Sequence, residues 1–324
     1  MIDQYNRTID YIRISITDRC DLRCVYCMPG EGVRPLLHED ILSFDEIVRI
    51  VRSLTGLGFR KVKITGGEPL ARKGCADVIR MIKDVPGIEK VTITTNGMAL
   101  EKELAGLVDA GLDALNISLD TLDPVLFQKI TRREGLDRVL RGIDAALKIP
   151  DLPLKINAVP TFQTDRDLLA LAAMAKEHKM HVRFIEMMPI GYGKDFPMRS
   201  EEEILALLER EYGPCTPCGE KLGYGPCHYY SLEGFQGRIG FISAITHKFC
   251  DQCNRVRLTS DGFLKACLQY QTGSDLKAAM RSGCTDEELT ELIRDTVYGK
   301  PLSHNFTEMK IKEEESKIMA QIGG

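Results

Sequence analysis

Strand-like and helix-like segments alternate through the first 190 residues, and this alternation restricts the fold more than any other feature. The pattern predicts strands over residues 11–16, 61–65, 91–95, 114–119, 154–159 and 181–187. It predicts helices between them, over residues 43–57, 76–84, 101–110, 136–147 and 165–178, with a linking stretch over 120–135. Segments of these lengths are typical of βαβ units, which build a parallel α/β sheet. Six such strands form either an open doubly wound sheet or a partial barrel.

Basic residues recur on one face of the predicted strands. Arg13 alternates with isoleucines, and Lys63, Lys155 and Arg183 stand in the same relation to their apolar neighbours. Buried parallel strands are usually apolar on both faces, whereas alternation with period 2 gives one apolar and one polar face. Any one of these side chains could instead lie near a strand end and extend to water. Four together favour a barrel whose lumen binds a polyanion.

The composition changes after residue 191. A helix is predicted over 199–211, and residues 213–240 are rich in Gly, Pro, Cys and Tyr with little periodicity, which predicts loops. Further helices are expected over 285–297 and 309–320. We therefore expect a core barrel over residues 1–215 and a C-terminal region over residues 216–324.

The charge balance argues against nucleic-acid and membrane partners. The chain has 43 Lys and Arg against 47 Asp and Glu, a net charge of −4, so no overall basic field exists. No apolar run approaches the ~18 residues needed to span a bilayer. The segment from Met1 to Asp10 is polar and lacks the apolar core of a signal peptide. We expect a cytoplasmic protein that binds neither nucleic acid nor membrane.

Three of the eleven cysteines follow the first predicted strand within eight residues, as Cys20, Cys24 and Cys27. Structural zinc sites usually have four ligands in two separated pairs. Three clustered thiolates instead suit three corners of a [4Fe–4S] cluster, which a fourth cysteine normally completes. No fourth cysteine is near, so one iron would be open to an external ligand. The alternative is three unrelated buried thiols.

A second cysteine triplet comprises Cys250, Cys253 and Cys267. It could hold zinc with His247 as a fourth ligand, or a second cluster. Arg255 and Arg257 alternate between these cysteines, and planar guanidinium groups suit bidentate phosphate contacts, although two arginines on a solvated loop would look the same. No role is assigned to the remaining cysteines, which are Cys75, Cys215, Cys218, Cys227 and Cys284.

The first triplet, together with Gly66-Gly67-Glu68-Pro69, resembles the radical S-adenosylmethionine (SAM) superfamily, in which the GGEP motif meets the SAM amino group. The second triplet with its Arg-x-Arg segment and the Gly323-Gly324 end is similar to the GTP 3′,8-cyclase family, also called molybdenum cofactor biosynthesis protein A. The resemblance extends from about Tyr11 to Gly324 and is weakest over residues 192–232. One departure is Lys63, where the family would have arginine.

The resemblance implies a role for each matching residue. Each cysteine triplet would hold a [4Fe–4S] cluster, the first binding SAM and the second meeting the guanine base. The residues that would contact SAM are Tyr26, Gly67, Ser118 and Met188. Those that would bind GTP are Arg13, Lys63, Thr94, Lys155, Arg255, Val256 and Arg257. The catalytic set would be Arg13, Gly323 and Gly324, the two glycines forming an inserted tail whose carboxylate meets the arginines.

The resemblance also implies a fold and a reaction. The fold is a partial (βα)6 radical SAM barrel with a C-terminal iron–sulfur region that closes its open side. The enzyme, a lyase, converts GTP to (8S)-3′,8-cyclo-7,8-dihydroguanosine 5′-triphosphate, an early step of molybdenum cofactor (molybdopterin) biosynthesis. The implied partners are a reductant protein and the downstream cyclic pyranopterin monophosphate synthase, with a homodimer left open.

Two other readings remain open from the sequence. One is a different radical SAM enzyme with an auxiliary cluster, such as an enzyme that modifies peptides. The other is a protein without catalytic activity, either an iron–sulfur electron carrier or a zinc-stabilised nucleic-acid module. The acidic charge balance and the barrel-like core argue against the second reading.

Overall fold

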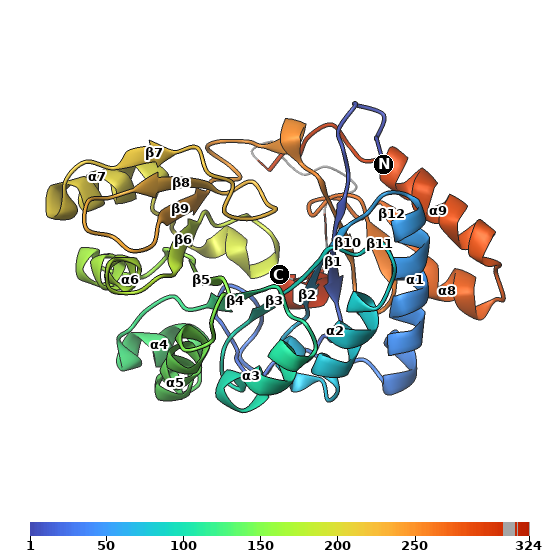
Figure 1. The fold of residues 1–324 in the computed structure, drawn as a ribbon, viewed down its shortest axis with the longest axis horizontal. Helices are drawn as coiled ribbons and strands as arrows, with labels where there is room; N and C mark the ends of the chain where they lie inside the picture. Colours follow the sequence, from blue (N-terminus) through green and yellow to red (C-terminus); the bar gives the residue numbers. More distant parts are fainter. Residues whose placement is uncertain (307–314, 316, 324) are drawn as a thin grey trace.

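The computed structural model describes residues 1–306, 315 and 317–323. Six parallel strands in sequence order form the middle of a twelve-stranded sheet. They are β1 (Tyr11–Ser15), β2 (Lys61–Thr65), β3 (Lys90–Thr95), β4 (Ala114–Ser118), β5 (Leu154–Ala158) and β6 (His181–Ile185). The helices between them lie outside the curved sheet (Figure 1): α1 (Phe44–Gly56), α2 (Cys75–Lys83), α3 (Leu100–Asp109), α4 (Pro124–Thr131), α5 (Leu136–Leu147) and α6 (Asp165–Glu177). The predicted partial (βα)6 barrel is confirmed.

The alternation within each strand decides which face meets the helices. Ile12, Ile14 and Ile64 are fully buried in the hydrophobic core between sheet and helices. Helix α1 begins at a capping box, in which the Ser43 side chain accepts a hydrogen bond from the Glu46 main chain and the Glu46 carboxylate accepts one from Ser43. The opposite face of the strands is left for polar side chains, which point into the barrel.

The register of the parallel strands aligns these polar residues in rows. Arg13 on β1 lies opposite Lys63 on β2, and on its other side it lies opposite Arg257. Further around the barrel, Asn116 on β4 lies between Thr94 on β3 and Lys155 on β5. Of the basic residues predicted to share a face, Arg13 and Lys63 therefore lie beside each other, and Lys155 lies further around the barrel.

The C-terminal region extends the sheet at both edges. Beyond β6 lies the parallel strand β9 (Ile239–Ile242), followed by antiparallel β8 (His228–Ser231) and β7 (Thr216–Cys218). Beyond β1 lies the parallel strand β10 (Arg255–Leu258), followed by antiparallel β11 (Phe263–Lys265) and β12 (Gly273–Asp275). Helix α7 (Glu201–Tyr212) accompanies the first group, and α8 (Leu276–Arg281) and α9 (Asp286–Tyr298) the second (Figure 1). A domain boundary near residue 215 stays a prediction.

Two segments to which the sequence analysis assigned no helix or strand contain regular structure. Residues 213–240 contain β7 and β8, which have three and four residues and no apolar alternation of their own. Pro217 is tolerated because β7 is an edge strand. Residues 120–135 contain α4, whose start carried a recognisable signal: Asp123 caps the helix and Pro124 is its first residue.

A short helix near the end of the sequence, α10 (Met319–Ile322), lies inside the barrel (Figure 1). Ala320 and Ile322 are buried there. Most of the helix predicted over 309–320 lies outside the described residues. Among the described residues, no helix has both the length and the apolar character needed to cross a membrane.

Candidate active site

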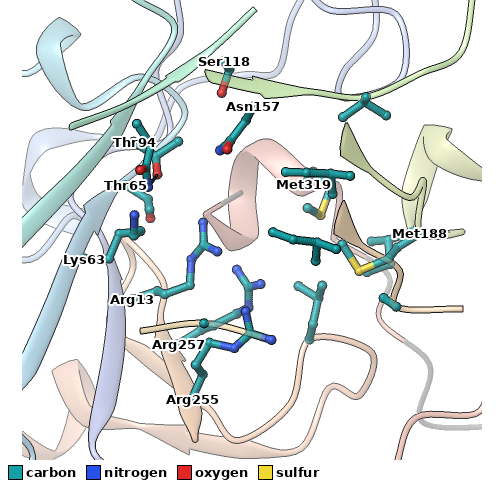
Figure 2. A pocket seen from close by; sticks show the side chains of 18 of the residues that line it. Arg13, Lys63, Thr65, Thr94, Ser118, Asn157, Met188, Arg255, Arg257 and Met319 are labelled. Carbon is teal, nitrogen blue, oxygen red and sulfur yellow. Dashed lines mark hydrogen bonds between the residues drawn. The ribbon is translucent and has the colours of Figure 1, made fainter. Parts of the chain in front are cut away.

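The barrel encloses a cavity of about 370 Å³, which all six central strands and the C-terminal region line. Figure 2 shows basic side chains from β1, β2 and β10 pointing into it, with α10 beside them. Both cysteine triplets line this one cavity, although some 220 residues separate them in the sequence. The lining cysteines of the two triplets are Cys20, Cys24, Cys27, Cys250, Cys253 and Cys267.

The first triplet lies in the loop after β1. A turn in which Cys27 N donates to Cys24 O at 2.9 Å brings the last two cysteines together. Arg132 closes the loop from outside, its Nη1 donating to Met28 O at 3.0 Å. Burial raises the pKa of all three thiols, that of Cys27 to about 11. Three desolvated thiols become thiolates when a metal coordinates them, so this donor set suits a cluster.

The Gly-Gly-Glu-Pro segment after β2 packs closely against the loop that carries the first triplet. A Cβ on Gly67 would lie 2.4 Å from Arg19 O, so only glycine fits this position. The buried Glu68 accepts hydrogen bonds from Thr95 Oγ1 at 2.7 Å and Asn96 N at 2.6 Å, which ties this segment to the loop after β3. Burial raises the pKa of Glu68 to about 7.

The four residues predicted to contact SAM all line the cavity. Ser118 and Met188 reach it from β4 and from the segment after β6 (Figure 2). Tyr26 Oη donates to Asp120 Oδ2 at 2.6 Å, which fixes the phenol ring beside the first triplet. Burial raises the pKa of Asp120 to about 6.

Arg257, Arg13 and Lys63 form a basic row on the wall of the cavity, and Lys155 and Arg183 lie further around the barrel. Burial, and then the charge of Arg183, lower the pKa of Lys155 to about 8 and hold that of Lys63 well below its ordinary value. Burial lowers the pKa of Arg13 to about 10, and that of Arg257 also falls. Each depressed pKa means that a positive charge is costly here, so an anion with several charges would be favoured.

The second triplet lies where β10 and β11 meet the cavity. Burial opposes ionisation of Cys253, but the charges of Lys300 and Arg255 outweigh it and lower the pKa of this thiol to about 6. His247, the ligand of the zinc alternative, does not line the cavity, and its Nδ1 lies 3.4 Å from Glu201 Oε2. In the described part of the chain, no three His, Cys, Asp or Glu side chains converge closely enough for a single metal ion.

The tail enters the cavity between the two triplets. Arg257 Nη1 donates to Gly323 O at 2.6 Å, and the Ala320 main chain hydrogen-bonds the Cys27 thiol. A Cβ on Gly323 would lie 2.9 Å from Ser15 Cβ, and its φ of +85° favours glycine. Gly324 lies outside the described residues.

The other predicted GTP-binding residues divide into two groups. Thr94 and Arg255 line the cavity with the basic row. Val256 does not, because its side chain is fully buried in the hydrophobic core. Arg183, which the sequence analysis placed on the basic face but not among the GTP-binding residues, also lines the cavity, and its Nε donates to Asn157 Oδ1 at 2.9 Å. The sequence analysis missed Lys300, which lines the cavity, follows a helix and carries no motif.

Two family models match the chain. Residues 14–175 match the radical SAM superfamily model, and residues 180–306 match the model for molybdenum cofactor synthesis C. Together the two models cover both cysteine triplets and the barrel strands apart from the first three residues of β1.

Curated relatives match over the full length. A GTP 3′,8-cyclase from Clostridium perfringens is 43% identical over 325 residues, which is 100% of both chains. A GTP 3′,8-cyclase from Syntrophomonas wolfei is 42% identical over 328 residues, again 100% of both.

A solved structure agrees with the fold. Streptococcus suis SuiB bound to the precursor peptide SuiA superposes with a TM-score of 0.62 at 17% identity, covering 92% of this chain and 66% of that one. This likeness shows the fold alone.

The family predicted from the two cysteine triplets is confirmed by the full-length relatives and the two models. The chain belongs to the GTP 3′,8-cyclase family of the radical SAM superfamily.

Proposed function

We propose that this chain binds GTP in the cavity between its two cysteine triplets and converts it to (8S)-3′,8-cyclo-7,8-dihydroguanosine 5′-triphosphate. The observation that carries the proposal is the placement of the basic row, Arg257, Arg13 and Lys63, on the wall of a cavity that both triplets line. The matching relatives carry the name of this activity. The product belongs to an early step of molybdenum cofactor biosynthesis.

The cofactors are SAM and two [4Fe–4S] clusters, the first on Cys20, Cys24 and Cys27 and the second on Cys250, Cys253 and Cys267. With SAM bound, the first cluster supplies the one-electron chemistry that removes a hydrogen atom from ribose C3′ so that C3′ can bond to guanine C8. Tyr26, Gly67, Ser118 and Met188 would shape the SAM site. The cluster on the second triplet would meet the guanine base.

The chain's own residues bind and orient GTP. Arg13, Lys63, Lys155, Arg255 and Arg257 would hold the triphosphate through charge-assisted hydrogen bonds, with Thr94 as a polar neighbour. Gly323, whose carbonyl oxygen accepts a hydrogen bond from Arg257 Nη1, would hold that guanidinium in place. Enclosure by α10 keeps water from a reactive site.

We further propose the partners and place of the reaction. A reductant protein would deliver the electron, and the downstream cyclic pyranopterin monophosphate synthase would consume the product. The reaction would take place in the cytoplasm, and a homodimer is compatible with it.

Anaerobic incubation with SAM, a reductant and each nucleoside triphosphate in turn tests the activity. We expect 5′-deoxyadenosine and a cyclised nucleotide with GTP and not with ATP, CTP or UTP. The Cys24→Ala variant is the control, since it removes a ligand of the first cluster. A peptide-modifying enzyme is the alternative, because the SuiB structure with its peptide has this fold. Absence of GTP binding by the cluster-loaded protein would favour that alternative.

A further inference from the structure

A buried lysine outside every motif lies beside the second triplet. Lys300 follows the end of α9 by two residues, is 3% exposed, and lines the cavity. Its Nζ donates to Arg255 O at 2.9 Å and to Ala266 O at 2.5 Å. Arg255 is two residues beyond Cys253, and Ala266 directly precedes Cys267. One ammonium group therefore joins the segment that carries the Cys253 thiol to the segment that carries the Cys267 thiol.

The positive charge of Lys300 has no carboxylate to offset it among the residues that the structure describes. Its hydrogen-bond acceptors are main-chain carbonyls, whereas the nearby buried Lys265 forms an ion pair with Glu315. A buried ammonium is costly unless a negative charge accompanies it. Burial acts to raise the pKa of the Cys250 and Cys253 thiols, and the charge of Lys300 acts to lower the pKa of both.

Arg7 holds the third thiol-bearing segment against the same turn. Its Nη1 donates to Cys250 O at 2.8 Å, and its Nη2 donates to Lys300 O at 3.3 Å and Pro301 O at 2.8 Å. The charge of Arg7 is already offset, because its Nη2 lies 2.6 Å from Asp3 Oδ2. Arg7 is thus a neutralised tether, whereas Lys300 and Arg255 are the two cations whose charges act on the Cys253 thiol.

We propose that Lys300 is the built-in counter-cation and tether of the second iron–sulfur site. It holds the segments of Cys253 and Cys267 at a fixed separation and offsets the negative charge of the thiolates. The inference rests on the proposal that this triplet holds a cluster. A cation beside the cluster ligands favours the reduced form of the cluster, which carries the more negative charge. Lys300 therefore raises the reduction potential of the second cluster. It is a positioning residue, because it acts through the cluster ligands.

The test compares Lys300→Met and Lys300→Arg with the parent enzyme, all reconstituted anaerobically as full-length proteins. The second cluster is followed by an EPR-monitored redox titration in a Cys24→Ala background, in which the first site is disabled. For Lys300→Met we expect the reduction equilibrium constant of the second cluster to fall about tenfold or more. For this one-electron couple a tenfold fall is a shift of about 59 mV. We also expect faster loss of iron to a chelator, and Lys300→Arg should restore most of the potential.

Lys277→Met is the matched control, because Lys277 Nζ also donates to a carbonyl, Asp40 O at 2.7 Å, and Lys277 does not line the cavity. This control should leave both the potential and the iron retention unchanged. If Lys300→Met keeps the parent's potential and iron retention, the inference is overturned. If the Cys24→Ala parent shows no cluster signal at all, the proposed cluster at the second triplet fails instead. If Lys300→Met cannot be reconstituted, Lys300→Gln takes its place, because glutamine keeps a hydrogen-bond donor and removes the charge. An unchanged reduction potential in Lys300→Gln also overturns the inference.

Discussion

Arg257 donates from Nη1 to the carbonyl oxygen of Gly323 at 2.6 Å, which links the strand next to β1 with the tail inside the barrel. Arg257 is buried and lies opposite Arg13 in the parallel register, so the tail reaches the centre of the basic row. Gly323 packs against Ser15 and Thr65 at the same place. The tail therefore forms part of the wall against which a nucleotide would rest.

Gly323→Ala should strongly reduce product formation and leave folding intact. The added Cβ would lie 2.9 Å from Ser15 Cβ and Thr65 Oγ1, and the positive φ is unfavourable for alanine, so the tail must shift. Because a misplacement of about 1 Å can cost ~100-fold in rate, we expect a loss of that order in cyclised product. Deleting both glycines should have the same effect, with both clusters and the GTP affinity nearly unchanged.

The matched control for this change is Gly213→Ala. Gly213 also has a positive φ, 86°, but a Cβ there would meet nothing within 4 Å. The Gly213→Ala variant has the backbone strain of the substitution without a clash in the cavity. The activity of this variant should therefore stay close to that of the parent enzyme. Full product formation by Gly323→Ala, measured by chromatography of the nucleotides, would show that the tail has no catalytic role.

The two triplets should be separable by single substitutions. Cys24→Ala should abolish SAM cleavage and leave the absorption of the second cluster. Cys253→Ala should keep the first cluster and some uncoupled release of 5′-deoxyadenosine, but no cyclised nucleotide. The first triplet lies in the loop after β1, and the second lies in the segments before β10 and after β11, so neither site should need the other in order to assemble. Iron analysis and visible spectra check this, and loss of all iron in either variant would contradict it.

Lys63→Met should weaken GTP binding. Charge-assisted hydrogen bonds contribute roughly 1.5–3 kcal/mol, so we expect an affinity loss on the order of tenfold to a hundredfold. Lys61→Met is the control on the same strand, because Lys61 Nζ pairs with Asp10 at 2.5 Å and does not line the cavity. Guanosine should bind far more weakly than GTP. Anaerobic calorimetry measures all of these, and equal affinities for GTP and guanosine would exclude the basic row as the triphosphate site.

The central part of this fold and site could be predicted from local patterns. Arg13, Lys63 and Lys155 were placed on one face because each alternates with apolar neighbours in a strand, and period 2 fixes the face without knowledge of the partner strand. The same reasoning placed the first triplet in a loop at the end of a strand. These features depend on residues that are near one another in the sequence.

The edges of the sheet could not be predicted in this way. Strand β10 lies beside β1 although some 240 residues separate Arg13 from Arg257, and nothing local to either strand specifies that pairing. Strands β7 and β8 are short edge strands that lack periodicity. Lys300 follows α9 in the way many exposed lysines follow helices, and only its burial between two carbonyls shows that it belongs to the site.

The affinity for GTP should fall as the pH rises through about 8. Burial and the charge of Arg183 lower the pKa of Lys155 to about 8, so this side chain is an ammonium below that pH and neutral above it in the free enzyme. A bound triphosphate favours the ammonium form of Lys155. At higher pH, Lys155 must therefore take up a proton when GTP binds, and this lowers the affinity for GTP. The phosphates are already ionised in this range, since their second pKa is about 6. Lys155→Arg should weaken the dependence, because a guanidinium stays charged. Calorimetry of the cluster-loaded enzyme without SAM, at pH 7 and at pH 9, measures the change, and an equally steep loss of affinity in Lys155→Arg would assign it to another group.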